Sequence, residues 1–239
     1  MSFTGPWEPN LAWRNYCDRL HEGWLGAFSA GTVLKTDLYD ESLTGGLFPW
    51  LSRRCIRVVG VDICPATVAR ARLLCPGLEA MVADVRALPF ADGELDLVVS
   101  NSTLDHFASP GDIAVGLAEI HRVLRPGGVL ALTLDNPCNP LVFVRNRLPG
   151  WRWLRRSGVS PYFAPHTLSM GALRRALEGV GFEVQQERYL MHVFRFLAVH
   201  LAPWLPLRFL LSWEALDALP TRPFTGYFVA VTARRSCPG

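Results

Sequence analysis

Short apolar runs recur through the middle of the chain, and polar or amphipathic stretches separate them. Helical spacing between the runs predicts helices over 65–74 and 112–124. The second helix is expected to end before Arg-Pro-Gly-Gly, because proline and glycine just past a helix are a stop signal. The runs themselves predict five strands, at 31–38, 57–62, 80–83, 95–100 and 129–134. This alternation is typical of βαβ units, so we expect a mainly parallel sheet with helices on both faces.

The two ends of the chain extend this pattern. Apolar residues at helical spacing over 10–29 predict one or two N-terminal helices. Towards the C-terminus we expect a helix over 170–180 and strands at 182–186 and 227–233. A hairpin of these last two strands would be interrupted by the long apolar segment between them. The expected fold class is therefore α/β, a Rossmann-like, mainly parallel seven-stranded sheet.

We expect a single domain over 1–239, with an N-terminal helical segment (1–30) and a core (31–135). Two segments, 136–168 and 188–225, lie outside that core and are rich in apolar and aromatic residues. Such additions are expected to form a lid over a hydrophobic or lipid-like acceptor. Their arginines also suit contact with an anionic membrane surface, which sedimentation with anionic vesicles would test. The alternative is a lid that packs its apolar side inward.

Polar residues follow the first five predicted strands, where an open parallel sheet binds its ligands. Asp62 follows the second strand, and an acid there typically accepts from ribose hydroxyls, although it could instead cap the next helix. Asp84 could accept from an adenine amino group while the Val85 amide meets a ring nitrogen, or it could simply form a turn. The remaining strand-end residues are Asp37, 100–106, Asp135 and Asn136.

Three motifs at these strand ends carry a resemblance. The segment 82–96 (VADVRALPFADGELD) resembles the D-x-x-x-L-P-F-x-D-x-x-F-D signature of class I S-adenosylmethionine-dependent methyltransferases. SNSTLDH at 100–106 and VLRPGG at 123–128 are similar to two further motifs of that family. The resemblance implies a methyltransferase (EC 2.1.1.-) with S-adenosyl-L-methionine as cofactor. It implies the following cofactor-binding residues: Asp37, Leu38, Tyr39, Asp62, Ile63, Asp84, Val85 and Asn101.

The first family motif is the exception. The family typically has acid-x-Gly-x-Gly-x-Gly here, whereas this chain has Lys35 at the acidic position and Asp37 and Tyr39 at two glycine positions. Glycine lets the backbone approach a ligand closely, and tyrosine cannot give the same clearance. Asp37 could compensate by accepting from the ammonium group of the cofactor. The alternative function is a catalytically silent, methyltransferase-like binding module that has lost normal cofactor binding.

Methyl transfer mainly requires alignment, and a base is needed only when the acceptor must lose a proton. His106 is the first candidate for that base, or else a structural histidine at a helix start. Asp105 and Asp135 are further candidates. We expect Asp135, Asn136 and His166 to line the acceptor site.

Composition and missing motifs disfavour several other kinds of binding site and reaction. The net charge of +3 is too small to indicate nucleic acid, and Lys35 is the only lysine. No C-x-x-C pair or histidine cluster suggests a metal site. The phosphate loop, the G-x-G-x-x-G dinucleotide fingerprint and the G-x-S-x-G elbow are all missing, which disfavours the rival chemistries. Without a signal-like start or a transmembrane-length run, we expect a cytoplasmic protein, peripheral at the inner membrane surface if its lid contacts lipid.

Overall fold

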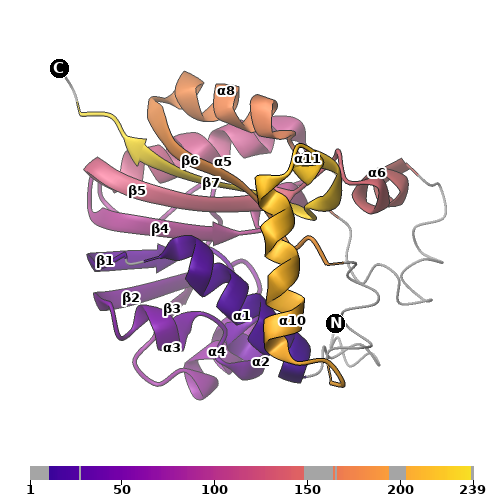
Figure 1. The fold of residues 1–239 in the computed structure, drawn as a ribbon. Helices are drawn as coiled ribbons and strands as arrows, with labels where there is room; N and C mark the ends of the chain where they lie inside the picture. Colours follow the sequence, from indigo (N-terminus) through magenta and orange to yellow (C-terminus); the bar gives the residue numbers. More distant parts are fainter. Residues whose placement is uncertain (1–10, 27, 148–163, 165, 194–202, 238–239) are drawn as a thin grey trace.

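A seven-stranded sheet organises the computed structural model, which describes residues 11–26, 28–147, 164, 166–193 and 203–237 (Figure 1). The strand order is β3-β2-β1-β4-β5-β7-β6, with β1 to β5 parallel and β7 antiparallel to both neighbours. The strands are β1 (Ala30–Lys35), β2 (Cys55–Asp62), β3 (Glu79–Val82), β4 (Leu95–Asn101), β5 (Leu124–Asp135), β6 (Phe182–Leu190) and β7 (Phe228–Arg235). This is the α/β, Rossmann-like fold that the apolar runs predict.

The helices lie on both faces of the sheet and in the excursion between β6 and β7. They are α1 (Leu11–Leu25), α2 (Glu41–Thr44), α3 (Phe48–Leu51), α4 (Pro65–Leu74), α5 (Pro110–Val123), α6 (Pro140–Arg147), α8 (Met170–Val180), α10 (Leu207–Ser212) and α11 (Arg222–Thr225). Two 3-10 turns, η1 (Leu104–His106) and η2 (Trp213–Ala218), complete the described elements. Residues 65–74 and 170–180 are helical as predicted.

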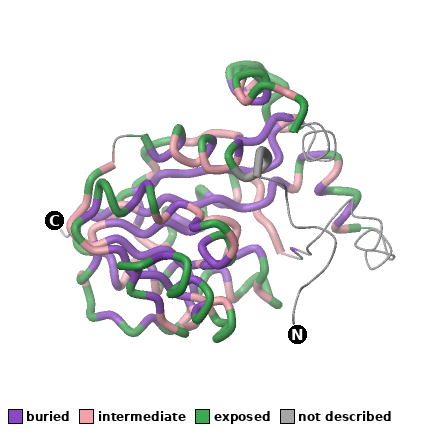
Figure 2. Tube along the Cα trace, turned by 90° about the horizontal axis from the view of Figure 1, so that it is seen from below, coloured by how far each residue is buried: buried purple, intermediate pink, exposed green. Residues whose placement is uncertain are grey.

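Two hydrophobic clusters hold these layers together, one on each face of the sheet. Along β4, Leu97 and Val99 belong to the cluster that α1, α3, α4 and α10 also join. Val98, between them, belongs to the cluster that α5 and α8 cover. Successive strand residues point to opposite faces, so a strand buried on both sides must be apolar at every position. The buried trace runs through the sheet in Figure 2, while exposed residues follow the outer sides of the helices.

The structure differs from the predicted elements at several strand ends. The first strand ends at Lys35 rather than at 38, because the chain turns there and two short helices, α2 and α3, follow. β5 begins at Leu124 rather than at 129, and β6 continues to Leu190 rather than ending at 186. The last two strands pair antiparallel from Phe182–Arg235 to Leu190–Phe228, and the long segment between them interrupts the hairpin, as the sequence predicts.

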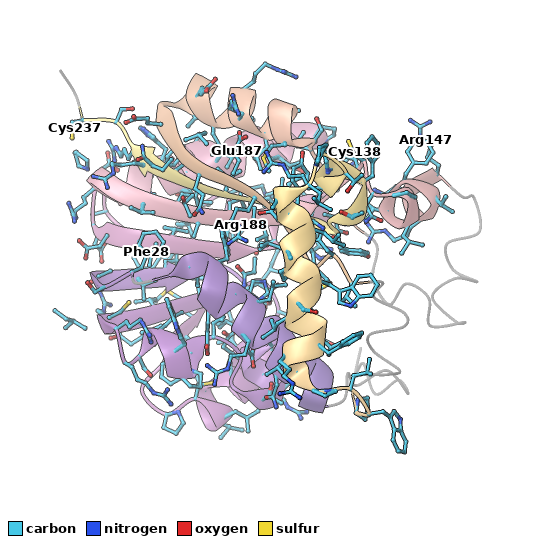
Figure 3. All side chains as sticks on the ribbon, in the orientation of Figure 1. Phe28, Cys138, Arg147, Glu187, Arg188 and Cys237 are labelled. Carbon is cyan, nitrogen blue, oxygen red and sulfur yellow. The ribbon has the colours of Figure 1, made fainter. Side chains whose placement is uncertain are left out.

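The excursion between β6 and β7 is fastened to β6 and α1 by polar contacts. Arg188 of β6 donates to Asp217 in η2 (Nε–Oδ2 2.9 Å), whereas its neighbour Glu187 pairs with Arg174 of α8 on the other face (Figure 3). Tyr16 of α1 donates to Glu214 in η2 (Oη–Oε1 2.8 Å). These contacts place the excursion over the face that carries α1.

Several large apolar side chains of the excursion face outward, including Trp204, which is 83% exposed, and Phe224. Within the described ranges, no helix combines the length and apolar character needed to cross a membrane. Contact of this surface with lipid therefore stays a prediction.

Candidate functional site

Polar side chains gather at the carboxyl edge of the sheet, around the point where strand order reverses between β1 and β4. β1 ends at Lys35, β2 at Asp62, β4 at Asn101 and β5 at Asp135. In open α/β sheets, this is the edge at which ligands bind. The structure thus brings together the strand ends that the sequence singled out.

A buried ion pair occupies the loop that follows β1. Lys35 is 2% exposed, and its ammonium nitrogen lies 3.3 Å from Oε2 of Glu41, which is fully buried. Lys35 Nζ also donates to the carbonyl of Asp37. Burial raises the pKa of Glu41 to about 7, and the nearby Lys35 acts in the opposite direction. Each charge therefore offsets the cost of burying the other.

The second carboxylate oxygen of Glu41 fixes the end of this loop. Glu41 Oε1 accepts from the amide of Leu47 at 3.0 Å. Gly46 has φ +50°, and a Cβ there would lie 2.6 Å from Glu41 Oε1, so a glycine is needed for the chain to fold over the carboxylate.

Asp62 joins the loop after β1 to the end of β2. Its Oδ2 accepts from the amide of Leu38 at 3.1 Å, and its Oδ1 accepts from the amide of Cys64 at 2.8 Å. The Leu38 side chain is buried against Gly60, where a Cβ would come within 2.5 Å of Leu38 Cδ2. Asp62 remains half-buried, and a carboxylate can accept more than these two hydrogen bonds. It is therefore still able to accept from ligand hydroxyls.

Two residues close to Asp37 and Asp62 in the sequence are exposed to solvent. Tyr39 and Ile63, two of the predicted cofactor-binding residues, are exposed at 51% and 69%. Asp37 Oδ1 accepts from the amide of Tyr39 at 2.8 Å. Burial raises the pKa of the Asp37 carboxyl group, and the positive charge of Lys35 acts to lower it.

Asp84 is held by Arg86. The guanidinium contacts both carboxylate oxygens (Nη2–Oδ2 2.6 Å, Nε–Oδ1 3.0 Å), and these hydrogen bonds lower the pKa of Asp84. Arg86 also lies 3.1 Å from Asp112 of α5. An adenine amino group would have to compete with Arg86 for the Asp84 carboxylate. Of the two predicted adenine contacts, the Val85 amide is the one that Arg86 does not occupy.

Hydroxyl groups link the ends of β1 and β4. Thr36 Oγ1 lies 2.9 Å from both Ser100 Oγ and Thr103 Oγ1. Asn101 ends β4, and its buried side-chain oxygen has no hydrogen-bond partner within the described part of the chain. The next residue, Ser102, has φ +48°, an unusual conformation for a residue with a side chain. Strained backbone beside an unpartnered oxygen is common at ligand sites.

Two buried carboxyl groups follow at the ends of β4 and β5. Asp105 Oδ2 accepts from Ser102 Oγ and from the amide of Asp135, both at 2.9 Å. Burial and the neighbouring Asp135 raise the pKa of Asp105 to about 6. Asp135 pairs with Arg145 of α6 (Nη2–Oδ2 2.5 Å), which also donates to Tyr227 Oη. This buried network ties α6 to the sheet.

The remaining predicted residues separate into three environments. The Asn136 side chain donates to the carbonyls of Pro223 and Gly226, both at 2.8 Å, so its amide is used within the fold. His106 is exposed at the end of η1. His166 Nε2 lies 2.8 Å from the carbonyl oxygen of Ala108, in the loop between η1 and α5.

His166 also lines a cavity of about 370 Å³ beyond the ends of β4 and β5. Its neighbour Thr167 donates to the carbonyl of Asp135, which connects this segment to β5. The described lining combines apolar with neutral polar side chains: Pro110, Ile113, Pro137, Asn146, His166, Thr167 and Leu168. The volume lies in the range of small-molecule sites.

Sequence reasoning missed two contributors, Glu41 and Arg145. Both compensate a buried charge at a strand end, Lys35 in one case and Asp135 in the other. The available signal was the charge of Lys35 directly after an apolar run, because a buried lysine requires a partner.

Comparisons with known proteins identify the family of this chain. A family model described as a methyltransferase domain matches residues 42–132. A probable S-adenosylmethionine-dependent methyltransferase of Mycolicibacterium smegmatis is 32% identical over 192 residues, 77% of this chain and 66% of that protein. The demethylmenaquinone methyltransferase of Thermus thermophilus is 32% identical over 182 residues, 66% of this chain and 77% of that protein.

A solved structure supports the same class of fold. The crystal structure of an S-adenosylmethionine-dependent methyltransferase from Mesorhizobium loti superposes with a TM-score of 0.59 at 20% identity, covering 87% of this chain and 92% of the other. The chain belongs to the class I S-adenosylmethionine-dependent methyltransferases, whose cofactor is S-adenosylmethionine.

The strand-end residues fit this cofactor. Half-buried Asp62 has acceptor capacity for ribose hydroxyls, and the half-buried carboxylate of Asp37 suits an ammonium group. The unpartnered, buried Asn101 Oδ1 is a further acceptor at the end of β4. The loop after β1 differs from the glycine-rich motif typical of the family, because Asp37 and Tyr39 stand at two of its glycine positions.

Proposed function

We propose that this chain transfers a methyl group from S-adenosylmethionine to a small acceptor with a hydrophobic or lipid-like body. The proposal rests on one arrangement. Hydrogen-bond acceptors lie in a row where strand order reverses between β1 and β4, and the His166 cavity is connected to the ends of β4 and β5. When bound, the cofactor supplies an electrophilic methyl group. The chain would supply proximity and alignment, which account for much of the rate in such displacements.

Towards the cofactor, we assign Asp62 to the ribose hydroxyls and Asp37 to the ammonium group. Val85, with Asp84 beside it, would meet the adenine, and Asn101 would accept a hydrogen bond at the end of β4. Leu38, Tyr39 and Ile63 would flank the ligand through the two loops. Supporting this assignment, the Leu38 amide already links the loop after β1 to the Asp62 carboxylate.

Towards the acceptor, we assign His166 and Pro137, which line the cavity. Asp135 and Asn136 were predicted to line it too, but both are fully buried and bonded within the fold, so we assign them to support of the segment that follows β5. The described lining of the His166 cavity holds an amide, an imidazole and a hydroxyl but no carboxylate, lysine or arginine. This composition supports a neutral acceptor with one hydrogen-bonding group. One relative is a demethylmenaquinone methyltransferase, and a lipid-like acceptor of that kind belongs to the class proposed here. If the acceptor must lose a proton, exposed His106 is the candidate base, with Asp105 behind it.

Replacing Asp62 by asparagine tests the cofactor assignment. Asparagine keeps one oxygen for the Leu38 amide but removes the charge that ribose hydroxyls would bond to. We expect binding of S-adenosylmethionine, measured by isothermal titration calorimetry, to weaken by about 1–3 kcal/mol. Asp92→Asn, at a largely exposed carboxylate outside the site, should bind like the wild type.

The same titration separates the two functions considered. A wild-type chain that binds no S-adenosylmethionine would support the catalytically silent binding module instead. Equal affinity of Asp62→Asn and wild type would show that the cofactor site has been misplaced.

Two ring compounds that differ in charge test the acceptor cavity. We expect 2-naphthol to bind and 2-naphthoate to bind at least about tenfold more weakly, because an anion finds no cation in the described lining. Saturation-transfer NMR, with competition, measures both affinities. Leu168→Trp would fill the half-buried edge of the cavity and should abolish naphthol binding.

Leu73→Trp provides the matched control, since Leu73 is 81% exposed on α4 and lies outside the cavity. This variant should bind naphthol as the wild type does. Naphthol binding that survives Leu168→Trp, or naphthoate binding as tight as naphthol binding, would contradict the acceptor assignment.

A further inference from the structure

The lysine at the end of β1 is an unusual residue in this chain. It is the only lysine in the sequence and lies fully buried at the end of β1. Its ammonium group contacts the Glu41 carboxylate and the Asp37 carbonyl. Burying a flexible, strongly hydrated ammonium is costly unless it is paired and hydrogen-bonded. The contacts are therefore specific features of this loop rather than a solvated surface charge.

The loop nevertheless holds more negative than positive charge. Within residues 35–41, one lysine stands against Asp37, Asp40 and Glu41. His21 of α1 adds no positive charge at neutral pH, because burial lowers its pKa to about 4. Glu41 is neutralised by Lys35, so Asp37 and Asp40 remain in excess. A cationic group of a ligand would balance this excess.

Of these two carboxylates, Asp37 lies close enough to Asp62, at the end of β2, for their charges to interact. Only one of its carboxylate oxygens, Oδ1, accepts a hydrogen bond within the described structure, from the Tyr39 amide at 2.8 Å. The other oxygen is open at a half-buried position. The bond from Lys35 Nζ to the Asp37 carbonyl fixes the backbone from which this carboxylate projects.

We propose that Lys35 is a positioning residue, which holds Asp37 so that its carboxylate receives the ammonium group at the amino-acid end of the cofactor. This inference rests on the proposed function and assigns recognition of that end to side-chain charge. Lys35 itself does not touch the ligand, because it is buried and already engaged by Glu41 and Asp37.

The test compares two ligands that share their nucleoside part. S-adenosylhomocysteine carries the amino-acid end, whereas 5′-methylthioadenosine lacks it. In Lys35→Met we expect affinity for S-adenosylhomocysteine to fall about tenfold, as for the loss of a hydrogen bond to a charged group, and affinity for methylthioadenosine to stay within about twofold. Asp37→Asn should show the same selective loss. Isothermal titration reads binding directly and needs no acceptor.

A second variant keeps the test decisive if Lys35→Met folds poorly. Lys35→Met with Glu41→Gln removes both members of the pair, leaves no unpaired charge at Glu41, and still lacks the donor to the Asp37 carbonyl. It should show the same selective loss. Arg174→Met, at an exposed pair on α8, should leave both affinities unchanged.

Unchanged affinity for S-adenosylhomocysteine in the folded variants would overturn the inference. So would an equal loss for both ligands, because that result indicates general disruption of the loop. A wild-type chain that binds neither ligand would instead refute the proposed function itself, and the inference with it.

Discussion

Lys35→Met is expected to lower the free energy of unfolding by about 3–5 kcal/mol at pH 8, the range found when one partner of a buried ion pair is removed. Lys35 is 2% exposed and Glu41 is fully buried, so water cannot replace the lost contact. The Asp37 carbonyl also loses its bond from Lys35 Nζ. Urea denaturation followed by circular dichroism measures the change. A loss of this size is a large part of the stability of an ordinary domain.

The pH dependence of this loss has a defined sign. The folded-state pKa of Glu41, about 7, is raised above its ordinary value of 4.5, so the folded chain is most favoured below pH 4.5 and loses stability as pH rises towards 7. Without Lys35 that pKa rises further, because the opposing positive charge is gone. The gap between the variant and the wild type should therefore be larger at pH 8 than at pH 6.

The double variant Lys35→Met/Glu41→Gln is the control for this explanation. Neutral side chains at both positions remove the uncompensated charge, and glutamine retains an oxygen for the Leu47 amide. We expect the double variant to recover most of the lost stability and to lose the pH dependence at Glu41. A double variant as unstable as Lys35→Met would show that the charge is not the cause.

How far the sequence predicts this molecule depends on the range of the interactions involved. Strands such as 95–100 and helices such as 65–74 were predictable because burial on a sheet face or along a helix stripe leaves a local, periodic pattern. The strand ends at Asp62 and Asn101 followed from the same pattern, since parallel strands end at one edge. The position of the excursion between β6 and β7 did not follow, because it depends on long-range contacts such as Tyr16–Glu214 and Arg188–Asp217.

The candidate site was predictable in position but not in its internal connections. Asp62 and Asp37 could be placed at the ligand-binding edge of the sheet because each follows a predicted strand. Sequence spacing does not encode the side-chain geometry that pairs Arg86 with Asp84. Nor does it encode the hydrogen bonds that the Asn136 amide donates to carbonyls near α11. The charge of Lys35 indicated an unusual loop, but only the structure identifies Glu41 as its partner.

Arg145→Met is the second substitution with a large expected effect, again about 3–5 kcal/mol of unfolding free energy. Arg145 is 4% exposed and lies 2.5 Å from the fully buried Asp135, and it also donates to Tyr227. Its removal takes the guanidinium away from the buried Asp135 carboxyl group, which neighbours that of Asp105. Thermal and urea unfolding measure the loss, and Arg147→Met supplies the control on the same helix. Arg147 is exposed beside Phe143, so its replacement should cost no more than about 0.5 kcal/mol.

The Asp105–Asp135 pair gives this loss a pH dependence. The folded-state pKa of Asp105, about 6, already lies above its ordinary value of 3.8, so its ionisation in the folded chain costs stability as pH rises from 3.8 towards 6. Loss of Arg145 takes a positive charge out of this buried network, so ionisation of Asp105 becomes more costly still, and the deficit of Arg145→Met should therefore grow between pH 5 and pH 8. Adding Asp135→Asn removes one of the two charges and should restore most of the stability at pH 8. If Arg145→Met were as stable as Arg147→Met across this range, the buried network would not be what fastens α6 to the end of β5.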